Sequence, residues 1–325
     1  MATINILAVE GALFSNITGF CDALYIANLW HQELTGSKER LFNTRILTMD
    51  GNPVNACGGI RIEPQGSIGD AGPCDYAIVS PQLPHKTQMP EGMDRLGLWL
   101  DGLTDCGTTV ASVCTGAFIL AETGLLDQRK ATTNWQFARM FRRRYPTVDL
   151  QADQMLVRDG SFITTGAVTA LYNLILYMVQ DLGSQALASV VSKALLIDHN
   201  RRDQTPYSRF MPARGHNDDQ IKAAQTYIEN DFSNIESIEE IAREVGVSPR
   251  HFIRRFKKAT GDPPLKYLQQ VRIEKAKEKL ETTRETVENI TWAVGYKDLS
   301  SFGRLFKQYT GLSPKVYRDR FSPHS

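Results

Sequence analysis

The sequence predicts a doubly wound α/β domain followed by an all-α domain with two helix-turn-helix units. Two observations support this. Over the first 200 residues, short apolar segments alternate with segments of helical periodicity, which is typical of parallel sheets covered by helices. From residue 218 onward strand signals are absent, and one pattern of about 27 positions occurs twice.

The overall composition is that of a globular protein. The chain has 325 residues, of which 42% are hydrophobic and 22% charged, which excludes disordered and collagen-like chains. We expect no membrane-spanning helix, and the first residues lack the features of a secretory signal. Five cysteines without CxxC spacing predict free thiols in a reducing compartment. We therefore expect a cytoplasmic protein without a metal or cofactor.

The first domain is predicted from alternating strand and helix signals. Short apolar segments predict parallel strands at residues 4–9, 44–49, 75–80 and 108–113, and a late strand at 161–165. Helical patterns cover residues 20–34, 93–103, 116–122, 135–144, 168–180 and 184–198. The last two helices are strongly apolar. They predict either core packing or the face of a homodimer.

A change in composition predicts the domain boundary. We assign residues 1–199 and 218–325 to two domains joined by a linker at 200–217, which has prolines and few core-forming residues. Residues 216–325 carry 19 basic and 16 acidic side chains, too mild an excess to identify a nucleic-acid binder by charge alone. Helices are predicted at residues 219–231, 238–245, 249–260, 265–281, 287–294 and 299–309.

The second domain contains an internal repeat. Residues 241–246, Ile-Ala-Arg-Glu-Val-Gly, are echoed 49 residues later by Ile-Thr-Trp-Ala-Val-Gly, and the match then continues at an offset of 50. Matched pairs include Phe252 and Phe302, Arg254 and Arg304, Phe256 and Phe306, Lys257 and Lys307, and Tyr267 and Tyr317. Each copy is a short helix, a glycine turn and a second helix, at about 238–260 and 287–310. This is helix-turn-helix spacing.

The second helix of each copy presents polar side chains outward. Phe252 and Phe256 lie at i and i+4 and face inward, with Ser248 and Asp298 as predicted N-caps of the two helices. Outward arginine can bind guanine bidentately, and serine can contact phosphate or base edges. A solvated charged face is the alternative for one such helix, and the duplication favours DNA binding. The candidate DNA-contacting residues are Arg250, His251, Arg254, Lys257, Leu299, Ser300, Ser301, Arg304 and Lys307.

The helix between the copies sets their spacing. Seventeen residues, 265–281, give a rigid spacer of roughly 25 Å. Successive major-groove segments on one side of DNA lie about 34 Å apart. One monomer is therefore expected to place both recognition helices in adjacent major-groove segments.

Residues 219–321 resemble the AraC/XylS-type DNA-binding domain. The motifs that carry the resemblance are residues 241–252 (IAREVGVSPRHF), 293–296 (AVGY), 301–307 (SFGRLFK) and 310–314 (TGLSP). The resemblance implies sequence-specific binding to double-stranded promoter DNA. It also implies transcriptional activation through RNA polymerase.

The first domain carries a candidate thiol. The strand at 108–113 runs into Cys114 and Thr115, and a helix begins at Gly116. This is a strand-turn-helix elbow of the kind that presents a nucleophile. The dipole of the following helix predicts a lowered thiol pKa, a partly favoured thiolate and selective alkylation of Cys114. The alternative is a buried, inert cysteine.

Residues 3–198 resemble the PfpI-like branch of the class I glutamine amidotransferase fold, which implies a flavodoxin-like sheet. The motifs are residues 111–117 (ASVCTGA), 121–127 (AETGLLD) and 131–135 (ATTNW). Catalytic relatives often place histidine where this chain has Thr115, and related regulators often have one at Asn134. Many have an acidic residue where it has Asn16, although Glu10 is near enough to substitute. None of the six histidines lies in a motif that would pair it with Cys114.

These departures predict a non-catalytic pocket for a small effector. Similar regulators respond to amino acids, amines or betaines. The candidate ligand-binding residues are Glu10, Asn16, Cys114, Thr115, Gly116, Asn134 and Trp135. We therefore predict a dimeric, ligand-responsive transcriptional regulator, an activator by resemblance. The alternatives are a PfpI-like Cys amidase, hydratase or deglycase fused to a DNA-binding domain, and a dimerisation scaffold with a vestigial pocket.

Overall fold

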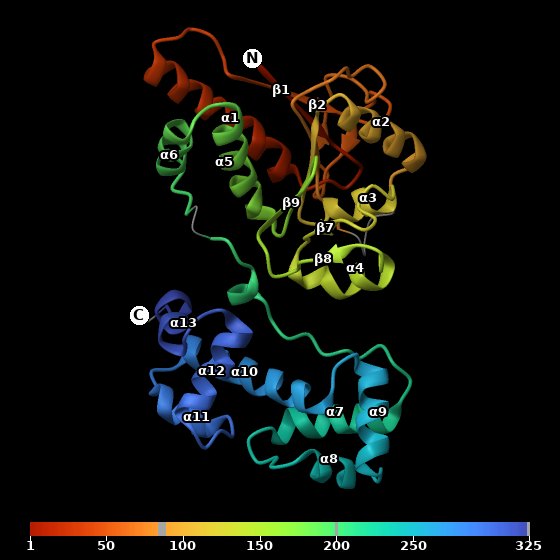
Figure 1. Ribbon diagram of the computed structural model, residues 1–325, viewed down its shortest axis with the longest axis vertical. Coiled ribbons are helices and arrows are strands. Elements are labelled where there is room, and N and C mark those ends of the chain that lie inside the picture. Colours follow the sequence, from red (N-terminus) through yellow and green to blue (C-terminus); the bar gives the residue numbers. More distant parts are fainter. Residues whose placement is uncertain (84–88, 199–200, 324–325) are drawn as a thin grey trace. The chain divides into compact units, whose positions relative to one another are not determined.

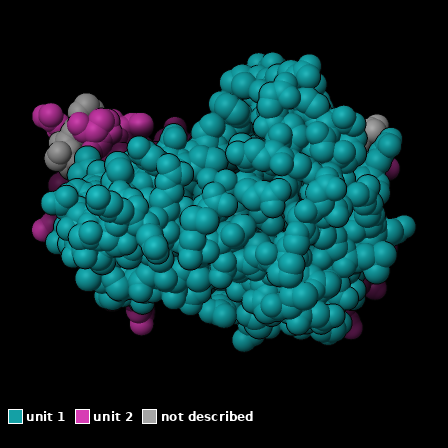
Figure 2. Space-filling model, turned by 90° about the horizontal axis from the view of Figure 1, so that it is seen from above, with its two compact units in different colours: residues 1–204 teal, residues 205–325 magenta. Residues whose placement is uncertain are grey.

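The chain forms two compact units. The computed structural model describes residues 1–83, 89–198 and 201–323. Unit 1 is Met1–Gln204 and unit 2 is Thr205–Ser325 (Figure 2). No helix in the described ranges is long and apolar enough to cross a membrane.

Unit 1 is built on a six-stranded sheet of order β2-β1-β5-β6-β10-β9. Its strands are β1 (Ala2–Leu7), β2 (Phe42–Leu47), β5 (Tyr76–Val79), β6 (Thr109–Val113), β9 (Leu156–Asp159) and β10 (Phe162–Thr165). All neighbours are parallel except β9, which pairs antiparallel with β10. The five predicted strands are confirmed, and β9 is a sixth at the edge. Two-residue pairs add β3 (Val54–Asn55) to β4 (Arg61–Ile62), and β7 (Lys130–Ala131) to β8 (Asp149–Leu150).

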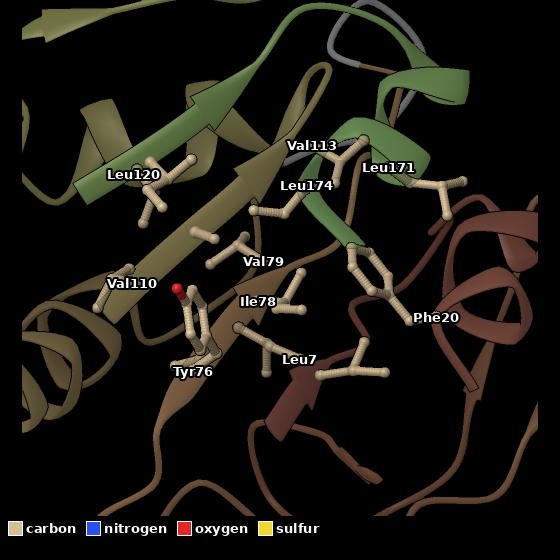
Figure 3. Packing of buried hydrophobic residues seen from close by; sticks show 14 of the residues in the cluster. Leu7, Phe20, Tyr76, Ile78, Val79, Val110, Val113, Leu120, Leu171 and Leu174 are labelled. Atoms are coloured by element: carbon tan, nitrogen blue, oxygen red, sulfur yellow. The ribbon is translucent and has the colours of Figure 1, made fainter. Parts of the chain in front are cut away.

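Helices cover both faces of the sheet, which makes the unit doubly wound (Figure 1). They are α1 (Phe14–Thr35), α2 (Met93–Asp105), α3 (Gly116–Glu122), α4 (Ala138–Arg144), α5 (Leu171–Leu182) and α6 (Gln185–Ala194), with 3-10 turns η1 (Trp135–Phe137) and η2 (Val168–Ala170). In Figure 3, Phe20 of α1 and Leu174 of α5 lie among the apolar side chains of the strands. The doubly wound prediction is confirmed.

The apolar sides of α5 and α6 are covered within the chain. Both helices contact α1 and each other. Their buried residues are Leu171, Leu174, Ile175, Leu176, Met178 and Val179 on α5, and Leu187, Ala188, Val191 and Ser192 on α6. Of the two predicted alternatives, core packing is confirmed for these residues, and a homodimer face on the remaining sides of α5 and α6 stays a prediction.

Unit 2 is all helical, as predicted. Its helices are α7 (Asp219–Asp231), α8 (Ile238–Glu244), α9 (Pro249–Thr260), α10 (Pro264–Thr282), α11 (Val287–Ala293), α12 (Leu299–Thr310) and α13 (Pro314–Phe321). We did not predict α13, which starts with Pro314 and is capped by Ser313. Helix α10 contributes Tyr267 and Leu268 to one core and Ile273 and Leu280 to a second. It therefore holds the two helix-turn-helix units together as a rigid spacer.

The segment expected to be a linker, residues 200–217, contains the unit boundary but is largely packed. Its residue 200, like residue 199 at the end of the predicted first domain, lies outside the described residues. The 3-10 turn η3 (Thr205–Tyr207) contacts α12. Phe210 stacks edge-on against Tyr267 at 4.9 Å, and the Ala213 carbonyl accepts a hydrogen bond from Gln225. The assignment of a linker at 200–217 remains a prediction.

The two predicted N-caps behave differently. Asp298 accepts a hydrogen bond from the Ser301 backbone N–H at 2.6 Å, which confirms it as the cap of α12. Ser248 occupies the N-cap position of α9, but its side chain makes no capping bond. Helix α9 has Pro249 at its first turn instead, and proline lacks an N–H that needs a partner there.

The glycines of the two turns predict unequal tolerance to substitution. Gly246 has φ +67° and open space around it, whereas a Cβ at Gly295, φ +86°, would lie 2.5 Å from the Ser233 carbonyl oxygen. We expect Gly246→Ala to cost about 1–2 kcal/mol from the left-handed backbone alone. Gly295→Ala should cost about 1–3 kcal/mol more through the overlap. Thermal melts of the full chain by circular dichroism test this ranking, and equal melting temperatures would contradict it.

Candidate nucleic-acid interface and ligand site

The two helix-turn-helix units repeat at the level of side chains. The ring of Phe256 lies 5.4 Å from that of Phe252 and 5.2 Å from that of Tyr267. The equivalent rings of the second unit are 5.6 and 5.4 Å apart. Thr260 and Thr310 both close the end of their helix by donating to the carbonyl four residues earlier. The sequence repeat is therefore a structural repeat, with α9 and α12 as equivalent helices.

The outer faces of α9 and α12 are open to solvent. Each of the nine predicted DNA-contacting side chains is exposed: Arg250, His251, Arg254 and Lys257, with Leu299, Ser300, Ser301, Arg304 and Lys307. Exposure is required for a DNA contact, so the geometry is compatible with the prediction. The contacts themselves remain a proposal.

Neighbouring arginines on α9 have different surroundings. Arg255 donates to both carboxylate oxygens of Asp218, at 3.0 and 2.7 Å, and to Gln220. Arg254 contacts only His251, at 3.2 Å, and no carboxylate pairs with it among the described residues. Arg255 therefore ties α9 to the start of α7. The Arg254 guanidinium is left available for an external acceptor.

The same arrangement occurs on α12. The Arg304 guanidinium lies 3.3 Å from the hydroxyl oxygen of Ser301, three residues earlier, as Arg254 lies beside His251.

Helix α10, which separates α9 from the second helix-turn-helix unit, has 19 residues and a length of about 28 Å. This is slightly longer than the predicted spacer, and it remains compatible with adjacent major-groove segments.

The predicted elbow at Cys114 is confirmed. Strand β6 ends at Val113, Cys114 has φ +53°, and α3 begins at Gly116. A left-handed backbone is strained for a residue with a side chain, and such strain concentrates at functional sites. A Cβ at Gly116 would lie 2.6 Å from the Val79 carbonyl oxygen, so only glycine lets α3 approach β5 this closely.

The predicted thiolate is wrong. Cys114 is 3% exposed, and its burial raises the pKa of the thiol above its usual range, against opposing hydrogen bonds from Thr115 and Asn134. Desolvation outweighs those hydrogen bonds and any effect of the short helix α3. The thiol therefore stays protonated at neutral pH. Among the described residues, neither a histidine nor a carboxylate contributes to this shift.

The other predicted ligand-binding residues occupy varied positions. Glu10 is exposed and its carboxylate accepts from the Asn55 backbone N–H at 2.9 Å, so it does not substitute for an acid beside the thiol. The Thr115 hydroxyl donates to the Gln82 carbonyl. Asn134 caps η1 by accepting from Gln136, and only part of Trp135 is exposed.

Two buried amide oxygens lie at the same edge of the sheet as Cys114. Asn16 and Gln82 are each 1% exposed, and their side-chain oxygens have no hydrogen-bond partner within the described chain. Asn16 follows β1, Gln82 follows β5 and Cys114 follows β6, and the carboxyl ends of parallel strands share one edge. Ligands of open α/β sheets bind at that edge. We missed Gln82, since no motif marks it.

Two other features of unit 1 bear on ligand binding. Across the described ranges, no group of three His, Cys, Asp or Glu side chains could hold a metal ion. A cavity of about 600 Å³ lies between α5, α6 and the chain at Arg201 and Arg202. None of the predicted ligand-binding residues lines this cavity. Their site is therefore distinct from it.

The raised pKa of Cys114 predicts an order of thiol reactivity. Cys57 and Cys106 are exposed, whereas Cys114 is buried. We expect iodoacetamide at neutral pH to alkylate Cys57 and Cys106 well before Cys114, because only an accessible thiolate reacts. Peptide mapping by mass spectrometry measures this order. Alkylation of Cys114 ahead of the exposed thiols would restore the activated-thiolate interpretation.

The fold and these sites define a two-domain protein that combines a doubly wound α/β unit with a duplicated helix-turn-helix unit. Residues 34–181 match the DJ-1/PfpI family, and residues 241–320 match a helix-turn-helix domain family. The chain therefore carries a DJ-1/PfpI domain and a helix-turn-helix domain of the AraC type, as the motifs implied.

Relatives with both parts are named transcriptional regulators. The HTH-type transcriptional regulator CdhR of Pseudomonas aeruginosa is 27% identical over 93% of this chain and 88% of the relative. GbdR of the same species is 22% identical over 97% of this chain and 84% of the relative. An AraC family transcriptional regulator from Pseudomonas putida has a crystal structure that covers 60% of this chain and 100% of its own, with a TM-score of 0.51 and 20% identity. That structure shows the fold of unit 1.

Proposed function

We propose that this protein is a sequence-specific DNA-binding transcriptional regulator controlled by a small metabolite bound in unit 1. The observation that carries the proposal is the structural repeat of α8-α9 and α11-α12, with exposed Arg254 and Arg304 at equivalent positions. Arginine bound bidentately to guanine supplies sequence recognition, and Lys257 and Lys307 supply phosphate contacts. The relatives named as transcriptional regulators support the same function.

The unpartnered amide oxygens suggest the chemistry of the effector. The Asn16 side-chain nitrogen donates to the Val168 carbonyl at 3.2 Å, and its side-chain oxygen has no hydrogen-bond partner among the described residues. A buried acceptor without a partner costs free energy, and a ligand N–H would remove that cost. We propose a primary amine or amino acid, because a betaine has no N–H to donate. Cys114 would line this site as a neutral thiol.

The enzyme alternative has less support. Nucleophilic catalysis needs a base near the thiol, and neither histidine nor a carboxylate affects the Cys114 thiol in the described structure. We therefore propose that unit 1 binds its ligand without turning it over.

The remaining partners follow from the proposed function. We propose that the protein acts in the cytoplasm and activates transcription through RNA polymerase. We also propose that it forms a homodimer in solution. Two exposed apolar side chains of α1, Tyr25 and Leu29, lie at i and i+4 on one face of the helix, so we propose that a second copy binds there. Sedimentation of the full chain tests this: Leu29→Glu should shift a dimer to monomer, and a monomeric wild type would reject it.

Selection of duplexes from a random library tests DNA recognition directly. The full chain should enrich one sequence motif, and amines or amino acids found by thermal shift should change its affinity for that motif. Enrichment without sequence preference would reject specific recognition. An affinity unchanged by every bound amine or amino acid would reject control by this class of metabolite.

A further inference from the structure

Gln204 is the last residue of unit 1, and its side chain is buried inside that unit. It is 1% exposed. Its amide nitrogen, which has two hydrogens to donate, lies within hydrogen-bond distance of the carbonyl oxygens of Thr133, Ala152 and Gln154, at 2.9, 3.2 and 3.0 Å. Its amide oxygen accepts from the Trp135 backbone N–H at 3.3 Å. An exposed linker residue would not make this many hydrogen bonds. The Gln204 side chain therefore occupies a defined position inside unit 1.

The buried position of the Gln204 side chain adjoins the Cys114 elbow. Thr133, whose carbonyl accepts from Gln204, donates through its hydroxyl to the Cys114 carbonyl at 2.8 Å. Asn134, which hydrogen-bonds the Cys114 thiol, lies between Thr133 and Trp135, two of the residues that Gln204 contacts. One side chain and one backbone segment thus connect the elbow to the end of unit 1.

Gly166 makes room for this amide. A Cβ at Gly166 would lie 1.9 Å from the Gln204 side-chain nitrogen. The backbone of Gly166 is not in the left-handed region, so alanine is allowed there by conformation. Glycine is therefore needed at this position to leave space for the Gln204 side chain, and not because of its backbone conformation.

The backbone at Gln204 is held to unit 1 by hydrogen bonds. The Gln204 N–H donates to the Asp153 carbonyl, and the Met155 N–H donates to the Arg202 carbonyl at 2.9 Å, which fixes the backbone to unit 1. Unit 2 begins at the next residue, and there Tyr207 packs against Phe321 with ring centroids 5.3 Å apart. Two residues, Thr205 and Pro206, separate Gln204 from Tyr207, so a change in the position of Gln204 acts directly on the start of unit 2.

We infer that Gln204 is the positioning residue that couples the Cys114 site to the DNA-binding unit. Ligand binding at the Cys114 elbow shifts residues 132–135. This shift moves the Gln204 side chain and, with it, the first residues of unit 2. The inference rests on the proposed function. Because coupling is reciprocal, DNA bound to unit 2 must also alter the surroundings of Cys114.

The test uses the full chain, the selected duplex and iodoacetamide as the probe. Alkylation of a buried thiol follows the equilibrium population of its opened state when opening and closing are fast. In wild type, saturating duplex should therefore change the alkylation rate of Cys114 by about 5-fold or more, the lower end of typical coupling. Gln204→Ala should bind the duplex and lose this dependence. Gln180→Ala, an exposed glutamine on α5, should keep it.

Gly166→Ala provides an independent variant. It should expel the Gln204 amide and reproduce the loss of coupling, and Gly166→Ala/Gln204→Ala should add nothing further because both changes act through one side chain. Melting temperatures of all variants show whether they fold. Gln204→Ala with wild-type coupling, or a wild-type Cys114 rate indifferent to bound duplex, would overturn the inference. Failure of wild type to bind any duplex specifically would reject the proposed function instead.

Discussion

Arg254→Ala should weaken binding to the selected duplex by about 5- to 150-fold, which corresponds to the roughly 1–3 kcal/mol of one bidentate contact with guanine. The preference at one base pair should relax at the same time. The reason is that Arg254 is exposed and lacks a carboxylate partner among the described residues, whereas the adjacent Arg255 is held by Asp218. Arg304→Ala should act similarly at a second position of the site.

Matched variants separate recognition from charge. Lys275→Ala removes one exposed positive charge from α10, which is not a recognition helix, and should leave sequence preference unchanged. Lys257→Ala should weaken all sequences alike and reduce the dependence of log K on log salt by about one contact. Titrations by fluorescence anisotropy at several salt concentrations measure each effect. Wild-type binding by both Arg254→Ala and Arg304→Ala would contradict the assignment of α9 and α12.

Asn16→Leu should abolish most of the response to the amine or amino acid that gives the largest thermal shift. A hydrogen bond to a charged group contributes about 1.5–3 kcal/mol, so affinity should fall about 10- to 150-fold. Leucine has the same branching and number of heavy side-chain atoms as asparagine, and it removes the hydrogen bond to the Val168 carbonyl. Calorimetric titration of the full chain measures the change, with a melt as the folding control.

Cys114 substitutions complete this comparison. Cys114→Ser keeps size and a neutral polar group, so effector-dependent DNA binding should persist. Cys114→Trp should fill the site and remove the response, although at 3% exposure its bulk also strains the core. A turnover that Cys114→Ser abolishes, or a covalent adduct with the effector in mass spectra, would favour the enzyme alternative.

Structural features that depend on residues close in sequence, such as helix bounds, could be predicted from the sequence. Capping residues, prolines and helical periodicity placed α3, α7 and α9 at their observed bounds. The duplication identified both helix-turn-helix units, because each repeats its core aromatic residues. Strand β9 was missed, since its four residues lack a clear apolar run and depend on pairing with β10.

The ligand site was predicted less completely for the same reason. The elbow at Cys114 follows from consecutive residues, so it was visible in the sequence. The protonation of its thiol depends on burial by distant segments, and there the local argument from the helix dipole was wrong. Gln82 and Gln204 belong to no motif. Their roles come from tertiary contacts, such as those of Gln204 with Thr133 and Gly166.

Hydroxyl-radical footprinting of the full chain on its selected duplex tests the central claim most directly. If α9 and α12 both bind DNA across the spacer α10, each monomer should protect two segments about one helical turn apart on one side of the duplex. Arg254→Ala should weaken protection of one segment and Arg304→Ala that of the other. A single protected segment per monomer, weakened by only one of these variants, would contradict the account.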